Sequence, residues 1–286
     1  MQFHRFPAMD SDTFSELADL TLDRSGQVLH PGKLALYDAR LMPLLRCEGF
    51  SSAAELAGCI RERGHEALGS ETVGRLVNGG GRFFSDPDTL SHCVDEFLTA
   101  RAIRQKGGKL RIWCAGAGHG QEAYSLAILL GENEALKGLS IDLLATDMSS
   151  EAVERIRAGT YSHFEIQKGL SVNRMLAHFR PLADRSWQAL GPLRNRVAVR
   201  VHNLLDSAEG LGRFDLIICR RVISTMAPVG QMRALENLSD RLLPGGLLVT
   251  GEHETISCLP EVFETDAEHR NLHARAGETE GAAAAA

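Results

Sequence analysis

Residues 114–125, CAGAGHGQEAYS, combine a glycine-rich loop with an acidic side chain in a way that suits binding of a small polar ligand. Gly116, Gly118 and Gly120 follow an apolar stretch and precede a helix-forming run. Because glycine has no side chain, a ligand can lie against the backbone N–H groups at the start of such a helix. The pattern predicts a ligand-binding loop here, although tight turns show similar glycine spacing.

The spacing of these glycines argues against a dinucleotide site. The dinucleotide fingerprint is G-x-G-x-x-G/A, with an acidic residue about 20 positions farther on. Here Gln121 stands where the third glycine or alanine is required, and the strand-end acid, Asp147, lies farther along the chain. Glu122 beside the loop would also repel a pyrophosphate. A nicotinamide-dependent oxidoreductase is therefore disfavoured.

A ligand with an amino-acid head and a ribose fits the two acidic residues better. Glu122 can meet an ammonium group, and Asp147 can accept hydrogen bonds from both ribose hydroxyls. S-adenosylmethionine carries this distribution of groups, with a cationic sulfonium and ammonium at one end. Two structural alternatives remain open: Asp147 as a cap of the next helix, and Glu122 as a first-turn acid favoured by the helix dipole.

Strands alternate with helices from residue 109 onward, which predicts an α/β domain with a parallel sheet. The expected strands cover 109–116, 139–147, 197–206, 214–224 and 245–253. Their largely apolar composition indicates a sheet covered on both faces. Ligands of such sheets bind at the carboxyl ends of the strands, where the strand order reverses.

The rest of the chain divides by composition. Residues 11 to about 78 read as helical, so we expect an N-terminal helical domain over 1–80, then a linker and connecting helix over 81–108. The ligand-binding domain covers 109–265, with an insertion at about 162–200. The small polar residues of 266–286 predict a disordered tail.

Composition limits the class of protein. The chain has 286 residues, 44% of them hydrophobic, and a net charge of −6, which argues against a nucleic-acid or membrane-surface role. It has neither an evident signal peptide nor an apolar run of the ~20 residues that cross a bilayer, so we expect a cytoplasmic protein that is not integral to a membrane. The six cysteines are dispersed without metal-ligand spacing, so we expect no metal site and interpret most of them as small buried hydrophobes.

The glycine loop also resembles a known family. WCAGAGHGQEAYSLAILL is similar to WSAGCSTGEEPYSLAMLL of the chemotaxis receptor glutamate methyltransferases, the CheR type. LLATDMSSEAVERIRAGTYS, VHNLLD, FDLIICRRVI and LLPGGLLVTGEHE resemble further motifs of that family, in the same order. In the helical region, SGQVLHPGKLALYDARLMPLL and LVNGGGRFFSDP do so too, and the resemblance extends over about 11–260. It implies a Rossmann-like class I methyltransferase domain that uses S-adenosyl-L-methionine and releases S-adenosyl-L-homocysteine.

The resemblance also implies site residues. The cofactor-binding set is Gly116, Ala117, Gly118, Gly120, Glu122, Asp147, Met148, Asn203, Leu204 and Arg220. In this family Glu122 would hold the methionyl amino group, Asp147 the ribose, and Asn203 with Leu204 would lie beside the adenine. The candidate catalytic residues are Arg82, Arg220 and Arg221, because Arg82 or Arg221 can replace a positive charge that the family places after the Phe pair.

The positions that face the methyl acceptor depart from the family pattern. Gly79, Gly80 and Gly81 replace an Asn-Glu-Thr trio, and Ser85 replaces the arginine after the Phe pair. Gln121, Arg221 and Thr225 replace a glutamate, an asparagine and a tyrosine. Two functions follow: a protein O-methyltransferase acting on side-chain carboxylates of a chemoreceptor or related signalling protein, which we favour, and a regulatory protein that binds the cofactor or its product with weakened catalysis.

Overall fold

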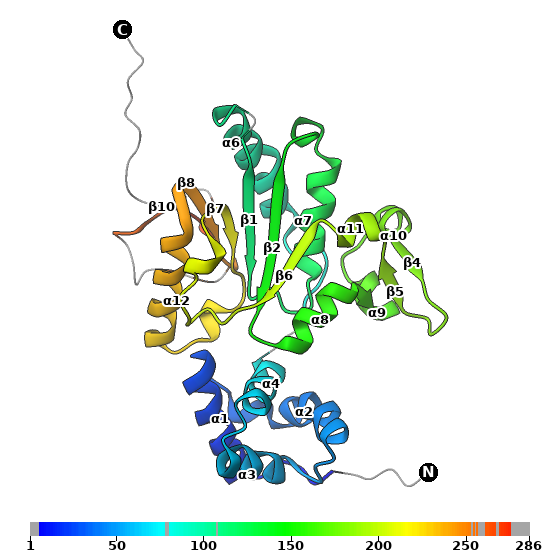
Figure 1. Cartoon of the computed structure of the whole chain (residues 1–286), viewed down its shortest axis with the longest axis vertical. Helices are drawn as coiled ribbons and strands as arrows, with labels where there is room; N and C mark the ends of the chain where they lie inside the picture. Colours follow the sequence, from blue (N-terminus) through cyan, green and yellow to red (C-terminus); the bar gives the residue numbers. More distant parts are fainter. Residues whose placement is uncertain are drawn as a thin grey trace.

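The computed structural model describes residues 6–77, 80–106, 108–252, 254, 256, 261–266 and 269–275. Its N-terminal part is helical, as the sequence predicts, and lies against one end of a central sheet (Figure 1). The helices are α1 (Ser11–Ser25), α2 (Leu34–Glu48), α3 (Ala53–Arg63) and α4 (Glu66–Val77), with the short turn η1 (Pro31–Lys33) before α2. Asp10 caps α1 by accepting from the Thr13 N–H, and Gly26 ends it in the left-handed region.

The central sheet is mostly parallel, which confirms the predicted α/β class. Its strands are β1 (Leu110–Ala115), β2 (Ile141–Asp147), β6 (Val197–Val201), β7 (Phe214–Ile218), β8 (Leu242–Val249), β9 (Phe263–Thr265) and β10 (Leu272–Arg275). In the described part of the chain their order is β6-β2-β1-β7-β8-β10-β9. The five strands that the sequence predicts are the parallel ones, and the strand order reverses between β1 and β7.

The end of the chain corrects one expectation. Within 266–286, which the sequence predicts to be disordered, Leu272–Arg275 forms β10 and pairs antiparallel with β8. Leu272 is buried, so this short segment contributes to the core. The sequence around it is polar and gives little sign of a strand, because β10 forms by pairing with β8 on one side and the short β9 on the other. Residues 276–286 lie outside the described residues.

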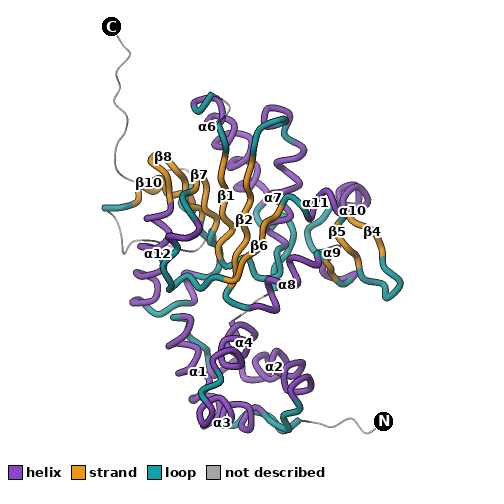
Figure 2. The backbone as a smooth tube through the Cα atoms, viewed as in Figure 1, coloured by secondary structure: helices purple, strands orange, loops and turns teal. Residues whose placement is uncertain are grey.

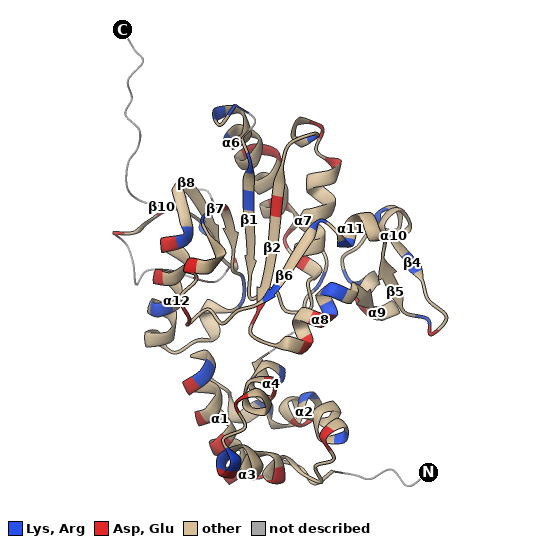
Figure 3. Ribbon diagram, viewed as in Figure 1, with Lys and Arg blue, Asp and Glu red and all other residues tan. Residues whose placement is uncertain are grey.

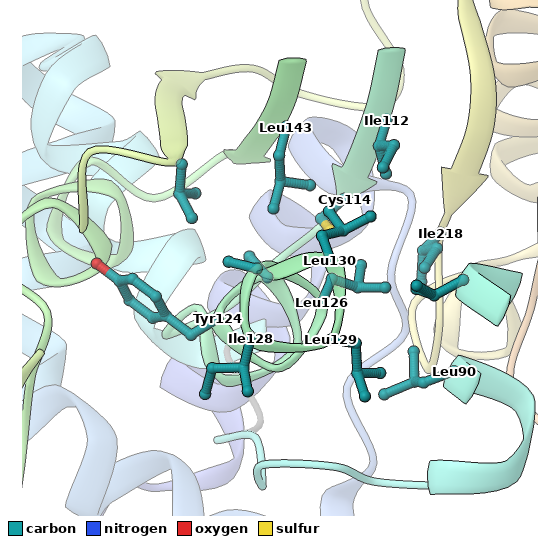
Figure 4. Packing of buried hydrophobic residues seen from close by; sticks show 14 of the residues in the cluster. Leu90, Ile112, Cys114, Tyr124, Leu126, Ile128, Leu129, Leu130, Leu143 and Ile218 are labelled. Carbon is teal, nitrogen blue, oxygen red and sulfur yellow. The ribbon is translucent and has the colours of Figure 1, made fainter. Parts of the chain in front are cut away.

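Alternate residues of β1, β2, β7 and β8 enter different cores, so both faces of the sheet are covered. Ile112 and Cys114 of β1 pack with α7 (Gln121–Glu132) on one face, and Trp113 with α12 (Pro228–Arg241) on the other. Figure 4 shows the leucines of α7 beneath β1 and β2. The helix α8 (Ser150–Ala158) follows β2 and contacts α4 of the N-terminal domain.

A continuous helical segment joins the N-terminal domain to the sheet. It consists of α5 (Pro87–Ser91), the π-helical η2 (His92–Leu98) and α6 (Thr99–Arg104). Its buried residues, among them Leu90 and Leu98, pack on the same face of the sheet as α7. The remaining short turns are η3 (Glu134–Leu136), η4 (Glu209–Leu211) and η5 (Ile223–Thr225).

The insertion is a small subdomain that projects from the side of the sheet (Figure 2). It contains β3 (Thr160–Tyr161), β4 (Phe179–Pro181), β5 (Trp187–Ala189), α9 (His163–Gln167), α10 (Val172–His178) and α11 (Gly191–Arg194), with strand order β3-β5-β4. Phe83, in the segment before α5, anchors the subdomain by ring contacts. The centroid of its ring lies 5.0 Å from that of Tyr161 and 5.5 Å from that of Phe179.

The N-terminal domain is fastened to the loops at the carboxyl ends of the strands. The Asn203 Nδ2 donates to the Arg24 carbonyl at 2.6 Å, and Gln27 forms an isolated antiparallel bridge with Met226. Acidic and basic residues are interspersed over both domains in the view of Figure 3. Within the described residues, every helix is too short or too polar to cross a membrane.

A candidate cofactor crevice

A crevice opens at the carboxyl ends of β1, β2 and β7, where the strand order reverses, as expected for this class of sheet. The N-terminal domain, the segment before α5 and the loops after the strands all contribute to it. Its lining is Ser25, Gln27, Val77, Gly80, Gly81, Gly116, Ala117, Gly118, Gln121, Glu122, Asp147, Met148, His202, Asn203, Leu204, Arg220, Arg221, Val222 and Met226.

The glycine loop forms one wall of the crevice. Gly116, Gly118 and Gly120 have φ angles of 66°, 56° and 85°, in the left-handed region that side chains disfavour. A Cβ at Gly116 would lie 2.8 Å from Val222 Cγ2, so the loop after β7 packs directly against this glycine. Gly120 is the N-cap of α7 and is not among the described lining residues, so its contribution is to turn the chain into that helix.

Asp147 ends β2 with its carboxylate held at the crevice by backbone amides. Its Oδ2 accepts from the Gly118 N–H at 2.8 Å and its Oδ1 from the Ser149 N–H at 3.0 Å. Burial raises the pKa of Asp147 to about 6, against the lowering effect of these amides. The alternative that Asp147 caps the next helix is wrong, because the cap of α8 is Ser149, which accepts from the Ala152 N–H.

Glu122 lies in the first turn of α7 and forms an ion pair with Arg220. The Arg220 Nη1 donates to Glu122 Oε1 at 2.7 Å, and both side chains are largely buried. Burial raises the pKa of Glu122, while the neighbouring Arg220 and Arg221 guanidinium groups lower it. The pairing therefore favours the ionised carboxylate at the place where the sequence predicts contact with an ammonium group.

Arg220 also holds the segment that precedes α5. Its Nη1 donates to the Ser85 carbonyl at 2.6 Å, and its Nη2 to Asp86 Oδ2 at 3.2 Å. Phe84 and Asp86 have φ angles of 47° and 71°, so the backbone at this contact is strained. Arg220 thus links the loop after β7, the cofactor wall and the connecting segment.

Arg221 lines the crevice and also has a strained backbone conformation. Its φ is 61°, and its backbone N–H donates to Glu254 Oε2 at 2.7 Å. The buried Glu254 carboxylate also accepts from Gly251 and from the N–H and hydroxyl of Ser224. Glu254 therefore fixes the loop on which Arg221 stands. His253, its neighbour in the sequence, lies outside the described residues.

The two candidates for the replaced positive charge are now separated. Arg221 lines the crevice, whereas Arg82 is exposed and absent from the described lining residues, so the structure favours Arg221 over Arg82 as the replacement for that charge. The reason is that Phe83 is fully buried in the core beside the subdomain, which leaves its preceding neighbour facing solvent. Ser85 is buried beneath Arg220, and Gly79 lies outside the described residues.

Asn203 and Thr225 make contacts that tie the N-terminal domain to the crevice. Asn203 lines the crevice, but its amide nitrogen donates to Arg24 and its Oδ1 accepts from the Leu205 N–H. Thr225 Oγ1 donates to Gln27 Oε1 at 2.8 Å. Both side chains thus connect the two domains.

Several lining residues were missed from the sequence. Ser25 ends α1 and Gln27 follows it, and His202 and Met226 come from loops beside Asn203 and Thr225. The sequence marks Gln121 as a mismatch with the dinucleotide fingerprint and as a departure from the family's glutamate, but it does not predict a binding role for this residue. Gln121 is 1% exposed, and neither amide atom has a hydrogen-bond partner among the residues that the structure describes.

The glycine loop is also fixed from outside by the subdomain. The Tyr161 hydroxyl donates to the His119 carbonyl at 2.7 Å, and Arg155 joins the His119 ring to Glu165. Burial and the adjacent Arg155 lower the pKa of His119 to about 4, so its ring is neutral at pH 7. Among the described residues there is no group of three or more His, Cys, Asp or Glu side chains placed to hold a metal ion.

Comparison with known proteins agrees with this site. Residues 80–271 match the family model described as CheR methyltransferase, SAM binding domain. The chain is 29% identical to the chemotaxis protein methyltransferase Cher2 of Pseudomonas putida, covering 84% of this chain and 88% of that protein. It is 30% identical to a chemotaxis protein methyltransferase of Vibrio parahaemolyticus, over 84% of this chain and 87% of the relative. A third relative, chemotaxis protein methyltransferase 1 of Pseudomonas aeruginosa, is 30% identical over 87% of this chain and 92% of its own length.

Proposed function

Since the chain belongs to the CheR family of S-adenosylmethionine-dependent methyltransferases, we propose that it transfers methyl groups to side-chain carboxylates of a signalling protein. The chemotaxis names of its relatives favour a chemoreceptor or a related protein as the acceptor, and a cytoplasmic location. Neither nucleic acid nor an integral membrane position is part of this proposal.

One observation carries the proposal: the same crevice contains a glycine loop without side chains and two buried carboxylates. These are Asp147 at the end of β2 and Glu122 in the first turn of α7. Asp147 keeps lone pairs available for ribose hydroxyls while two amides orient it. Gly116 and Gly118 leave backbone exposed beside it, and Glu122 offers charge to an ammonium group. This donor and acceptor set fits S-adenosylmethionine, for which Met148, Asn203 and Leu204 would complete the nucleoside end.

The reaction requires little proton transfer by the protein. Bound in the crevice, S-adenosylmethionine supplies an electrophilic methyl group. A carboxylate acceptor is already ionised at pH 7, so the protein need not provide a general base. The protein aligns the acceptor carboxylate with the methyl group and excludes water from the crevice. Arg221 is placed to orient the anionic acceptor, and Arg220 acts through Glu122 and the 85–86 segment, which it holds against the loop.

The proposal is tested by binding and by transfer. Calorimetry with S-adenosylhomocysteine measures cofactor binding, and transfer of labelled methyl to extract proteins, followed by base treatment, detects methyl esters. Arg221→Ala should reduce transfer strongly and leave product binding nearly unchanged. Arg82→Ala is the matched control because Arg82 is exposed outside the crevice. Equal activities of the two variants would contradict the assignment of Arg221.

The regulatory alternative has one observation in its favour. Gly80 and Gly81 leave the acceptor side of the crevice without side chains. Among the described lining residues, only Arg221 is available to replace the family's arginine, because the neighbouring Arg220 is already paired with Glu122. Tight binding of S-adenosylhomocysteine without base-labile label in any extract protein would favour this alternative over transfer.

A further inference from the structure

Gln121 is buried at the start of α7 without the hydrogen bonds that a buried amide normally makes. Only 1% of the residue is exposed, and its Oε1 and Nε2 both lack partners within the described chain. An unpaired buried amide is destabilising, and most buried polar side chains are satisfied in folded proteins. Because Gln121 lines the crevice, a ligand can supply both missing partners.

The neighbours of Gln121 restrict what that ligand can be. A Cβ at Gly81 would lie 2.6 Å from Gln121 Oε1, so the bare backbone at this position is what leaves room for the amide. Glu122, the next residue, is already paired with Arg220 at 2.7 Å. The first turn of α7 also presents N–H groups without intrahelical partners, which favour an anion.

We propose that Gln121 binds the amino-acid head of the cofactor, with Nε2 donating to the α-carboxylate and Oε1 accepting from the α-ammonium. The two amide atoms match the two charges of a zwitterion, one donor to one acceptor. A phosphate in the same place would leave Oε1 without a donor and would face Glu122. The inference rests on the proposed function, because it requires the methionyl end to lie beside the glycine loop.

The test compares two ligands that differ in this head. S-adenosylhomocysteine carries the amino-acid group, whereas 5′-methylthioadenosine has the same nucleoside without it. Gln121→Met keeps the side-chain volume and removes both polar atoms. Gln167→Met is the matched control, since Gln167 is exposed on α9, outside the described lining of the crevice. Calorimetry gives the Kd of each ligand, and thermal unfolding gives Tm without ligand.

Gln121→Met should weaken S-adenosylhomocysteine binding by about tenfold to a hundredfold, the range for hydrogen bonds to charged groups. Binding of 5′-methylthioadenosine should be unchanged, and the Tm of the unliganded variant should rise because an unpaired amide is removed. Gln167→Met should change neither affinity.

Two results would overturn the inference alone: an equal loss of affinity for both ligands, or an unchanged affinity for both. A lowered Tm of Gln121→Met would identify the amide as a structural group and would also overturn it. If the wild-type protein failed to bind S-adenosylhomocysteine, the proposed function would fall as well, so the two failures are distinguishable.

Discussion

The buried carboxylate of Asp147 makes cofactor binding depend on pH in a range where an ordinary aspartate would not. Burial raises its pKa from 3.8 to about 6, although the N–H groups of Ser149, Gly118 and Met148 lower it. The ribose hydroxyls proposed to contact it are hydrogen-bond donors, so the ionised carboxylate is the form that binds. Acidification from pH 8 to pH 5 should therefore weaken binding of S-adenosylhomocysteine.

The size of this effect follows from the fraction of ionised Asp147. One pH unit below the pKa, about a tenth of the protein carries the ionised carboxylate, and the apparent Kd increases in inverse proportion to that fraction. Binding at pH 5 should thus be about tenfold weaker than at pH 8, which corresponds to about 1.4 kcal/mol. An aspartate at its ordinary pKa would remain ionised throughout this range.

Calorimetric titrations between pH 5 and pH 8 measure this dependence. Asp147→Asn should bind weakly at every pH and lose the change attributed to Asp147. Asp142→Asn is a matched control, because Asp142 lies near the opposite end of the same strand and pairs there with Lys109. Glu122 is the other lining carboxylate whose pKa burial raises, so Glu122→Gln separates its contribution. A wild-type Kd that is constant from pH 8 to pH 5 would refute the reasoning.

Three further predictions concern stability and the shape of the loop. Because the folded pKa of Asp147 lies above its unfolded value, its contribution to stability is present at low pH and is lost as the pH rises from about 4 through 6. Relative to Asp147→Asn, the wild type should lose about 3 kcal/mol over that interval in urea unfolding, and a constant difference would contradict this. Arg220→Met should cost about 3–5 kcal/mol by leaving Glu122 buried and unpaired, whereas adding Glu122→Gln should restore part of the loss; no restoration in urea unfolding would argue against the pair. Gly116→Ala should destabilise the fold by at least ~1–2 kcal/mol, the cost of a residue with a Cβ in the left-handed region, and should also block product binding. Gly138→Ala is the control: its φ is 80° and no described atom lies within 4 Å of its Cβ, so it should only destabilise the fold. Urea unfolding and calorimetry measure the two effects.

The core of the fold was predictable because buried parallel strands are apolar runs bounded by turns. β1, β2 and β7 meet this description, and α8 after β2 begins with an evident cap, Ser149. β10 does not, because its four residues form a strand through pairing with β8, which ends well before it in the sequence, and with the short β9. Long-range pairing of this kind leaves little local signal.

The same distinction explains which site residues were found. Gly118 lies in the loop that follows β1, and Asp147 ends β2. Because the ends of parallel strands meet at one edge of a sheet, the closeness of these two residues follows from the sequence. Gln27 reaches the crevice through pairing with Met226, which is distant in the sequence, and no local pattern reveals this contact. Arg82 and Arg221 are equivalent in sequence, and only the folded structure shows that Arg221 lines the crevice while Arg82 is exposed.

Local features that disfavour the unliganded fold gather at the crevice. Of the five described non-glycine residues with positive φ, three are Phe84, Asp86 and Arg221, which hold or line the site. The unpaired amide of Gln121 and the raised pKa of Asp147 are further costs at the same place. Packing alone would replace such groups with apolar residues, so their concentration argues that a polar ligand compensates them. A ligand that satisfies these groups should stabilise the protein by more than its apolar contacts alone would provide, because binding removes penalties that the folded chain already carries.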